Sequence, residues 1–354
     1  MSLRLHALRK ISFTFFVGVL AATSVVAQQN RVEFNFAGID AWLKCEQRST
    51  DVLAYGCYRA SAETEGGRLA EVAIPSFGTV PGKRADDASA ARVAALTATL
   101  RSLSVDDLDA EAAALFPPQS GVVRIYVVGN GVPVWGDMYE RNFAHLHDHP
   151  QLDDTGEPVI LINARLVAGL YSDDAAKQKA TASQVLRHEL FHIHYAWFRA
   201  QDSRWRAIAS TMNADQQLLL LVQDEGIAHF LASREEWRSQ GFPKARGEKA
   251  LAELAKAIAE IHAGKPTKAI LQNANEGSYW DKFGAISGAL FAYGVEKHEG
   301  AAGLKTSLRE GPPSLLLQYD RAAQQDVTLP PLPASLLEWA EKNSTMLAAA
   351  TRLQ

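Results

Sequence analysis

Two short runs of apolar, mostly β-branched residues contrast with the helical spacing found along most of the chain. Residues 122–128 and 159–163 are apolar at nearly every position, which predicts two buried strands. Residues 86–115 carry apolar side chains at helical spacing, and a Pro-Pro pair marks a boundary after them. Beyond residue 233 the pattern predicts helices at about 247–263, 278–298, 301–309, 313–325 and 333–351. The pattern therefore predicts an α+β fold with a small sheet and a mostly helical C-terminal part.

Two long helices are predicted in the middle of the chain. Residues 173–200 contain no Pro or Gly, and Asp173 or Asp174 can cap the helix at its start. A second helix is predicted over residues 214–233, with Asn213 as its cap. Both segments are apolar nearly all round and are interrupted by a few charged or imidazole side chains. Such side chains need partners when they are buried.

His188, Glu189 and His192 interrupt the first of these helices as an HExxH motif. Residues four apart on a helix lie about 40° apart around the axis and one turn apart along it, so both imidazoles can bind one metal ion. Glu189 is rotated from His188 by about 100° and can reach a water molecule at that metal. A solvated motif without metal is the alternative, but it fits poorly with the apolar surroundings.

Asp224, Glu225 and His229 interrupt the second helix. Because burying an uncompensated carboxylate is costly, one acid is expected to have a charged partner, and Glu225 is the predicted third metal ligand. Gly226 beside it would let this helix approach the HExxH helix closely. Asp224 is suited to accept a hydrogen bond from a metal-binding histidine. His229 shares a helix face with Glu225 and can be a partner of a ligand, an oxyanion donor, an alternative ligand or a packed neutral histidine.

Four other histidines are candidates for metal binding. His194 points about 200° away from His192 around the helix, so we expect it to be hydrogen-bonded on the far face. His145, His147 and His149 alternate between the two predicted strands. They can form a second metal site, a lid near a catalytic cleft or a solvated loop.

His188, Glu189, His192 and the segment from Glu225 to Ala228 resemble the gluzincin class of zinc metallopeptidases. In that class HExxH supplies two histidines and a glutamate on a following helix supplies the third ligand. The resemblance covers roughly residues 159–319. It implies a zincin-like fold with a small mixed sheet beside the HExxH helix, and one Zn²⁺ held by His188, His192 and Glu225. It also implies that Glu189 is the general base and that peptides are the substrates.

Two features of the chain set it apart from the familiar members of that class. The 32 residues between His192 and Glu225 exceed the usual spacing, which points to another, secreted bacterial branch.

Some gluzincin aminopeptidases carry a tyrosine after the glutamate helix, and its phenol stabilises the tetrahedral oxyanion. Tyr279 resembles it, although one extra residue separates it from Gly284. Tyr279 is therefore either an oxyanion donor, with His229 as the other candidate, or a packed aromatic side chain. Zincins also pair extended substrates with an edge strand, and residues 159–163 are compatible with such a strand.

Residues 1–27 have the form of a secretory signal peptide. Three basic residues precede a short apolar core, and Ala27 ends a segment suited to cleavage. An uncleaved anchor is less well supported because the core is short. The protein is therefore expected to be periplasmic or secreted, without stable membrane insertion after cleavage. Export would allow Cys45 and Cys57, the two cysteines of the chain, to form a disulfide, with two free buried thiols as the alternative.

Charge and length narrow the choice of function. Cleavage would change the net charge from −4 to −7, because three basic residues and no acidic residue are removed, and this balance argues against a nucleic-acid binder.

Residues 28–118 are predicted to form an N-terminal mixed and helical region, and residues 119–354 a zincin-like catalytic domain with a helical C-terminal lobe. The leading function is a zinc metallopeptidase acting on peptides or proteins. The alternatives are a zincin-like metal-binding module without turnover and a zinc amide or ester hydrolase on a non-peptide. The intact Glu189 argues against the module. The sequence leaves the oligomeric state and endo- versus exo-cleavage open.

Overall fold

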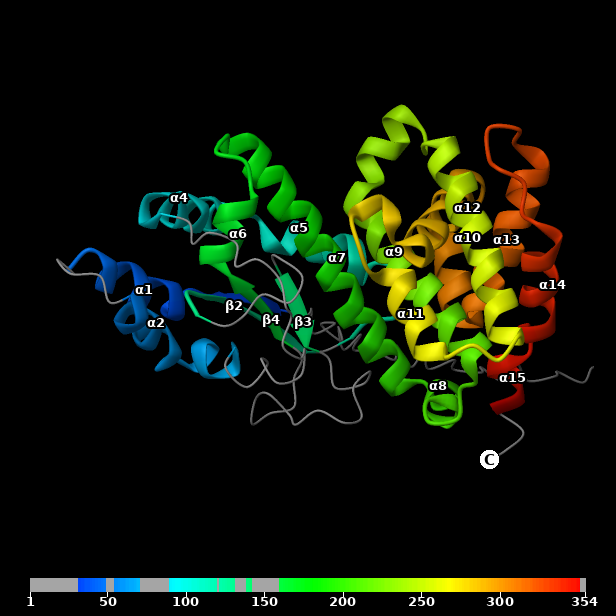
Figure 1. Ribbon diagram of the computed structural model, residues 1–354, viewed down its shortest axis with the longest axis horizontal. Coiled ribbons are helices and arrows are strands. Elements are labelled where there is room, and N and C mark those ends of the chain that lie inside the picture. The colour runs from blue at the N-terminus through cyan, green and yellow to red at the C-terminus, as the bar shows by residue number, and fades with distance from the viewer. Residues whose placement is uncertain are drawn as a thin grey trace, which may run out of the picture.

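The computed structural model describes residues 31–48, 54–70, 89–119, 121–130, 138–141 and 159–350. The predicted signal peptide and the segment with His145, His147 and His149 lie outside these residues. A small sheet with its helices forms one end of the molecule, and the C-terminal helices form the other (Figure 1). The long helix α7, which spans Ala175–Gln201, runs between the two ends. The structure is thus a mixture of helices and a small sheet, as predicted.

The sheet has four strands in the order β1-β2-β4-β3. They are β1 (Arg31–Asn35), β2 (Val122–Val128), β3 (Met138–Arg141) and β4 (Val159–Asn163). β1, β2 and β4 are parallel, and β3 is antiparallel to β4. The two strands expected from their apolar runs are confirmed with the predicted bounds. β4 is an inner strand with every residue buried, whereas β3 lies at the edge and contacts α7.

Helices of the N-terminal region pack around this sheet. They are α1 (Ala37–Glu46), α2 (Ala54–Ala62), α4 (Ala90–Arg101) and α5 (Val105–Ala113), with α6 (Ala164–Leu170) following β4. The helical pattern predicted at residues 86–115 corresponds to α4 and α5. Because β1 pairs with β2, the sheet joins the region before residue 118 to the region after it.

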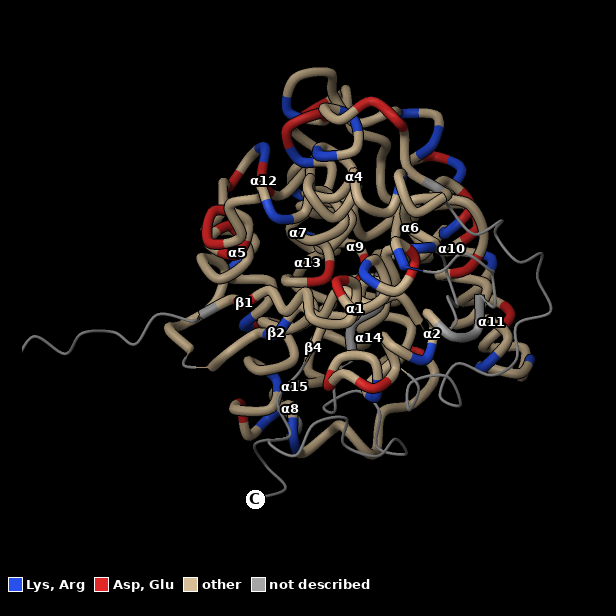
Figure 2. Tube along the Cα trace, turned by 90° about the vertical axis from the view of Figure 1, so that its left-hand side faces the viewer, with Lys and Arg blue, Asp and Glu red and all other residues tan. Residues whose placement is uncertain are grey.

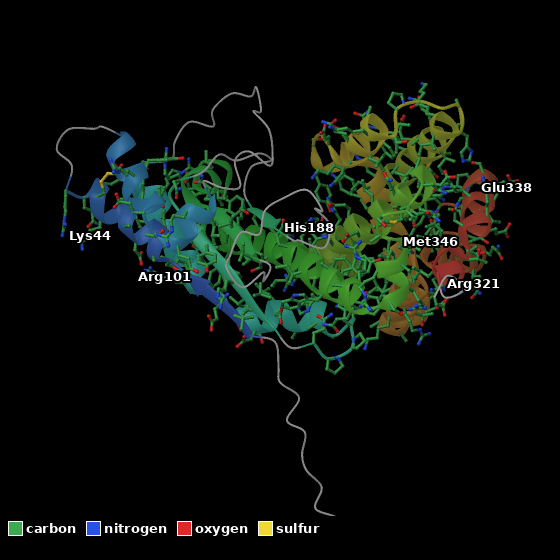
Figure 3. The ribbon with its side chains drawn as sticks, turned by 90° about the horizontal axis from the view of Figure 1, so that it is seen from below. Lys44, Arg101, His188, Arg321, Glu338 and Met346 are labelled. Carbon is green, nitrogen blue, oxygen red and sulfur yellow. A yellow bond between two sulfur atoms is a disulfide. The ribbon has the colours of Figure 1, made fainter. Side chains whose placement is uncertain are left out.

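A disulfide joins α1 to α2. Cys45 and Cys57 are bonded, and both ends of the bridge lie near Lys44 in Figure 3. The bridge confirms the paired alternative over two free thiols. It closes a loop with a sequence separation of 12 residues, which ties two short helices together.

The two long central helices begin where their capping residues predict. The side chain of Asp174 accepts a hydrogen bond from the backbone N–H of Lys177 at the start of α7. Helix α9 spans Ala214–Gln240, and Asn213 and Gln216 form a reciprocal capping box there. α9 runs to Gln240, beyond the predicted end at residue 233, and packs against α7. The short helix α8 (Ser203–Ile208) lies between them in the chain.

The C-terminal part is helical, as predicted. It comprises α10 (Lys244–His262), α11 (Thr267–Asn275), the 3₁₀ turn η1 (Tyr279–Asp281), α12 (Phe283–Glu310), α13 (Pro312–Gln325), α14 (Ala334–Asn343) and α15 (Met346–Ala350). Gly300, with φ 63° and ψ −165°, is not helical and divides α12 into two stretches, which matches the break predicted between residues 298 and 301. Within the described ranges, no helix is long and apolar enough to cross a bilayer. Lys and Arg lie among Asp and Glu along the helices (Figure 2).

Gly226 serves a different contact from the one predicted. A Cβ atom on Gly226 would lie 2.3 Å from Cα of Gly288 in α12, and one on Gly288 would lie 1.8 Å from the carbonyl oxygen of Val222. The two glycines thus bring α9 and α12 into backbone contact. The expectation that Gly226 lets α9 approach the HExxH helix is wrong, because this face of α9 meets α12 and not α7.

Gly226→Ala is expected to destabilise the protein by about 3 kcal/mol or more, because rigid backbone has to move to admit the methyl group. Urea denaturation would measure the change in the free energy of unfolding. Gly247→Ala is the matched control, since its Cβ would meet the flexible side chain of Leu290 at 3.0 Å. A Gly226→Ala protein as stable as Gly247→Ala would contradict the close helix contact.

Candidate metal centre

Helices α7 and α9 bring the three predicted metal ligands together. Nε2 of His188 lies 3.0 Å from Nε2 of His192, its neighbour one turn along α7. Oε2 of Glu225 on α9 lies 3.6 Å from the first of these nitrogens and 3.8 Å from the second. His188 faces the region between the two ends of the molecule (Figure 3). Two imidazoles and one carboxylate therefore converge on one point.

The hydrogen bonds of His192 determine which of its nitrogens is free for a metal. Its Nδ1 lies 2.7 Å from Oδ1 of Asp224, so the ring donates from Nδ1 to the carboxylate. A neutral imidazole then carries its lone pair on Nε2, the atom that faces His188 and Glu225. A carboxylate behind the ring is the usual support of a metal-binding histidine. Asp224 therefore has the partner expected from the sequence, and Nη2 of Arg199 lies 3.4 Å from its other oxygen.

His229 lies beside the three predicted ligands. It is buried, and its ring centre is 4.7 Å from that of His188. Its Nδ1 lies 2.9 Å from the backbone carbonyl oxygen of Glu225 and donates to it, which leaves the lone pair on Nε2. His188, Glu225 and His229 also offer ligand atoms within 4.8 Å of one another. His188 and Glu225 are thus shared by two possible ligand sets, one completed by His192 and the other by His229.

Burial keeps His188 and His229 neutral. It lowers the pKa of His188 well below the ordinary value of 6.5, and the neighbouring histidines lower it further. Burial also lowers the pKa of His229 to about 3. Burial raises the pKa of Glu225, although His192 and a hydrogen bond from Asn275 act in the opposite direction. Neutral imidazoles are the form that binds a metal, and a nearby cation would restore the charge of Glu225.

A cavity of about 970 Å³ opens on this cluster between α7, α9 and α11. Its walls are Thr181, Gln184, Val185, His188, Glu189, His192, Leu221, Glu225, His229, Ala232, Ser233, Lys268, Leu271, Gln272, Asn275, Glu276, Tyr279 and Lys282. Glu189, which is 8% exposed, thus faces the same space as the histidines on either side of it in the motif. The cavity is large enough for several residues of a peptide.

Tyr279 reaches the cavity from the turn before α12. Its hydroxyl lies 2.9 Å from Oγ of Ser233, and its ring centre is 5.3 Å from that of His229. Burial raises the pKa of Tyr279 to about 12, so the phenol keeps its proton at neutral pH and can donate a hydrogen bond. A neutral His229 already donates its N–H to the Glu225 carbonyl. The neutral His229 ring therefore has no second N–H to donate, whereas the Tyr279 hydroxyl keeps its proton.

Lys282 and Asn275 also line the cavity, and neither is among the site residues predicted from the sequence. Asn275 ends α11 and hydrogen-bonds Glu225. Lys282 immediately precedes α12 and lies in the segment that begins with Tyr279. The resemblance around Tyr279 could have drawn attention to Lys282, whereas no local signal marks Asn275.

His194 lies apart from the cluster, as predicted. Its Nδ1 is 2.8 Å from Oε1 of Gln119, and its Nε2 is 2.7 Å from Oδ1 of Asp109. The ring is fully buried on the far side of α7. This confirms the expectation of a hydrogen-bonded histidine on the far face.

Comparison with known proteins identifies one matching family. No curated protein and no solved structure matches the chain. A family model matches residues 137–328, which are more than half of the 354 residues. The matched region includes His188, Glu189, His192 and Glu225. The chain belongs to this family, whose description is "Putative zinc dependent peptidase (DUF5700)".

Proposed function

We propose that the protein is a secreted or periplasmic zinc metallopeptidase in which His188, His192 and Glu225 hold one Zn²⁺. The observation that carries the proposal is the convergence of Nε2, Nε2 and Oε2 within 3.8 Å of one another at a cavity that Glu189 also lines. Membership of a zinc-dependent peptidase family supports it.

The chemistry of the three side chains fits zinc. Two imidazoles and one carboxylate are a donor set found in catalytic zinc sites, where they leave one position open. The Asp224–His192 hydrogen bond of 2.7 Å leaves the lone pair on Nε2 of His192, the atom that faces the other two ligands. The open cavity beside the cluster gives a substrate access to it.

Glu189 and Tyr279 would perform the proton transfer and charge stabilisation. Zinc, when bound, would polarise the scissile carbonyl and lower the pKa of a water molecule. The carboxylate of Glu189 would take the proton from the attacking water and deliver it to the leaving amine. The phenol of Tyr279, held by Ser233, would donate a hydrogen bond to the carbonyl oxygen as that oxygen gains negative charge.

The placement of β3 suggests how a peptide would lie. β3 is the antiparallel edge strand, and it contacts α7, which carries the HExxH motif. An edge strand has unpaired backbone groups that can pair with an extended chain. In a zincin-like arrangement the substrate would therefore pair with β3 rather than with the inner strand β4.

A peptide-library digest tests the function. The zinc-loaded protein should cleave peptides, chelation should abolish cleavage, and added zinc should restore it. Full zinc occupancy without any cleavage would instead indicate a metal-binding module. Cleavage of esters or non-peptide amides alone would indicate the other hydrolase alternative.

Asp224→Asn is expected to weaken zinc binding by about 10–100-fold, because the amide supports the Nε2 lone pair of His192 less well than the carboxylate does. Competition with a fluorescent chelator would measure the affinity. Asp215→Asn is the matched control, since Asp215 is a buried acid on the same helix that bonds His262 and Trp339. Equal zinc affinities of the two variants would show that Asp224 does not support the metal.

Secretion predicts both processing and oxidation of the chain. Protein recovered from the periplasm or medium should lack residues 1–27 and should yield no free thiol after unfolding without reductant. Intact-mass analysis and thiol titration measure both. Because a short closed loop contributes on the order of 3 kcal/mol by the chain-entropy model, reduction should also lower the free energy of unfolding. A mass that retains the first 27 residues would contradict cleavage at Ala27.

A further inference from the structure

Lys282 is a cation in the wall of the cavity. It lies between the 3₁₀ turn η1 and the first residue of α12, and its side chain is partly buried. Other lysines of this part of the chain have acidic partners: Lys249 pairs with Asp281, and Lys297 pairs with Asp326. Within the described part of the chain, no hydrogen bond or ion pair joins the side chain of Lys282 to another residue. Its ammonium group therefore makes no ion pair in that part of the chain and acts on the Glu225 carboxylate only at longer range.

The ammonium group of Lys282 acts on the metal cluster. It lies close enough to lower the pKa of His188, His229 and Glu225, each of which is already shifted more strongly by burial. A lysine beside a zinc site repels the metal ion, and this repulsion is stronger where water is partly excluded. An anion bound between or beside the Lys282 ammonium group and the zinc ion would offset the repulsion between them.

The rest of this wall favours an anionic ligand as well. Helix α11 contributes Lys268 and the amides of Gln272 and Asn275, all of which can donate hydrogen bonds. Three acids line the cavity, and two of them, Glu189 and Glu225, belong to the proposed catalytic group. The remaining donors therefore face the space where a substrate would lie.

We propose that Lys282 binds a carboxylate of the substrate, so that peptides with a carboxylate close to the scissile bond are preferred. The proposal rests on the proposed function of the site, since it names the substrate of the same cavity. A carboxylate can come from the C-terminus of the peptide or from an Asp or Glu side chain. Both are recognised by the same ammonium group through a charge-assisted hydrogen bond.

A matched set of peptides separates the two sources. Four peptides share one sequence and differ only near the scissile bond. The first has a neutral side chain there and an amidated C-terminus, and the second has a free C-terminus close to the bond. The third has Glu near the bond and the fourth has Lys. The wild-type protein is expected to show at least a ten-fold higher kcat/KM for one or both carboxylate peptides. Preference for the free C-terminus indicates trimming from that end, and preference for Glu indicates acidic side-chain specificity.

Substitutions then test the residue. Lys282→Met should remove the preference mainly through KM, with zinc content and Tm unchanged, and Lys282→Glu should shift the preference to the Lys peptide. Lys256→Met is the control and should keep the preference, because Lys256 is an exposed lysine of α10 that pairs with Glu253 and does not line the cavity. Equal cleavage of all four peptides by the wild type would overturn the proposal. So would a loss of kcat in Lys282→Met that is the same for every peptide, which would place Lys282 at the carbonyl oxygen.

Binding gives a readout that does not depend on turnover. Fluorescence anisotropy of labelled peptides on the zinc-loaded protein should show at least ten-fold tighter binding of a carboxylate peptide to the wild type than to Lys282→Met. If the protein binds in this way but cleaves no peptide, the proposed peptidase function fails while the carboxylate site stands. If it cleaves peptides but binds all four alike, the carboxylate site fails and the peptidase function stands.

Discussion

Glu189→Gln is expected to lower kcat for peptide hydrolysis by about 10²–10⁴-fold while zinc stays bound at one ion per chain. The amide has nearly the shape of the carboxylate, so the cavity and the histidines on either side should keep their positions. It cannot accept a proton at neutral pH, which removes the general base. Peptide turnover measured beside the zinc content of the same sample checks both parts of the expectation.

Glu276→Gln is the control for this experiment. Glu276 lines the same cavity but lies outside the cluster of His188, His192 and Glu225. Its substitution changes the charge of the cavity by the same amount and should leave kcat near the wild-type value. If Glu276→Gln loses as much activity as Glu189→Gln, the loss comes from cavity charge, and Glu189 has no special role. A Glu189→Gln protein with wild-type turnover would remove the general-base assignment directly.

The parts of the fold that depend on local signals could be predicted from the sequence. α7 and α9 begin at the predicted residues because Asp174 and Asn213 hydrogen-bond backbone groups of the first turn. β2 and β4 have the predicted bounds because each is a run of apolar residues buried on both faces. In each case the information lies within a few residues of the element itself.

The parts that depend on distant partners could not be predicted. β1 is stabilised by pairing with β2, about 90 residues later in the chain, and its own five residues are too mixed to mark a strand. Gly226 illustrates the same limit. A helical glycine predicts a close approach, but nothing in its neighbourhood tells whether the approaching backbone belongs to α7 or to α12.

The candidate site divides in the same way. His188 and His192 are brought together by helix geometry alone, so the motif predicts their proximity. The place of Glu225 depends on how α9 packs against α7 across 32 intervening residues, and Lys282 reaches the cavity only because η1 and α12 return to it. The cost of burying a carboxylate and the resemblance to a known class both indicate Glu225, whereas only the packing shows that Lys282 lines the cavity.

The largest expected effects on metal binding come from His188→Ala, His192→Ala and Glu225→Ala. Each substitution removes one of three proposed protein ligands. Loss of a supporting residue behind a ligand typically costs 10–100-fold in affinity, so loss of a ligand itself should cost more than about 100-fold. Competition with a chelator of known affinity measures the change. His298→Ala, at an exposed histidine of α12, should bind zinc as the wild type does and controls for adventitious binding.

His229→Ala decides between the two overlapping ligand sets. With zinc on His188, His192 and Glu225, this variant should lose less affinity than any of the three ligand variants, because His229 only packs beside them. The alternative set of His188, Glu225 and His229 predicts that His229→Ala is as damaging as His188→Ala and that His192→Ala is mild. A third result, in which Glu225→Ala binds as tightly as the wild type while His229→Ala does not, would mean that three histidines hold the metal. Nε2 of His229 carries the lone pair that such a site requires, because its Nδ1 donates to the Glu225 carbonyl.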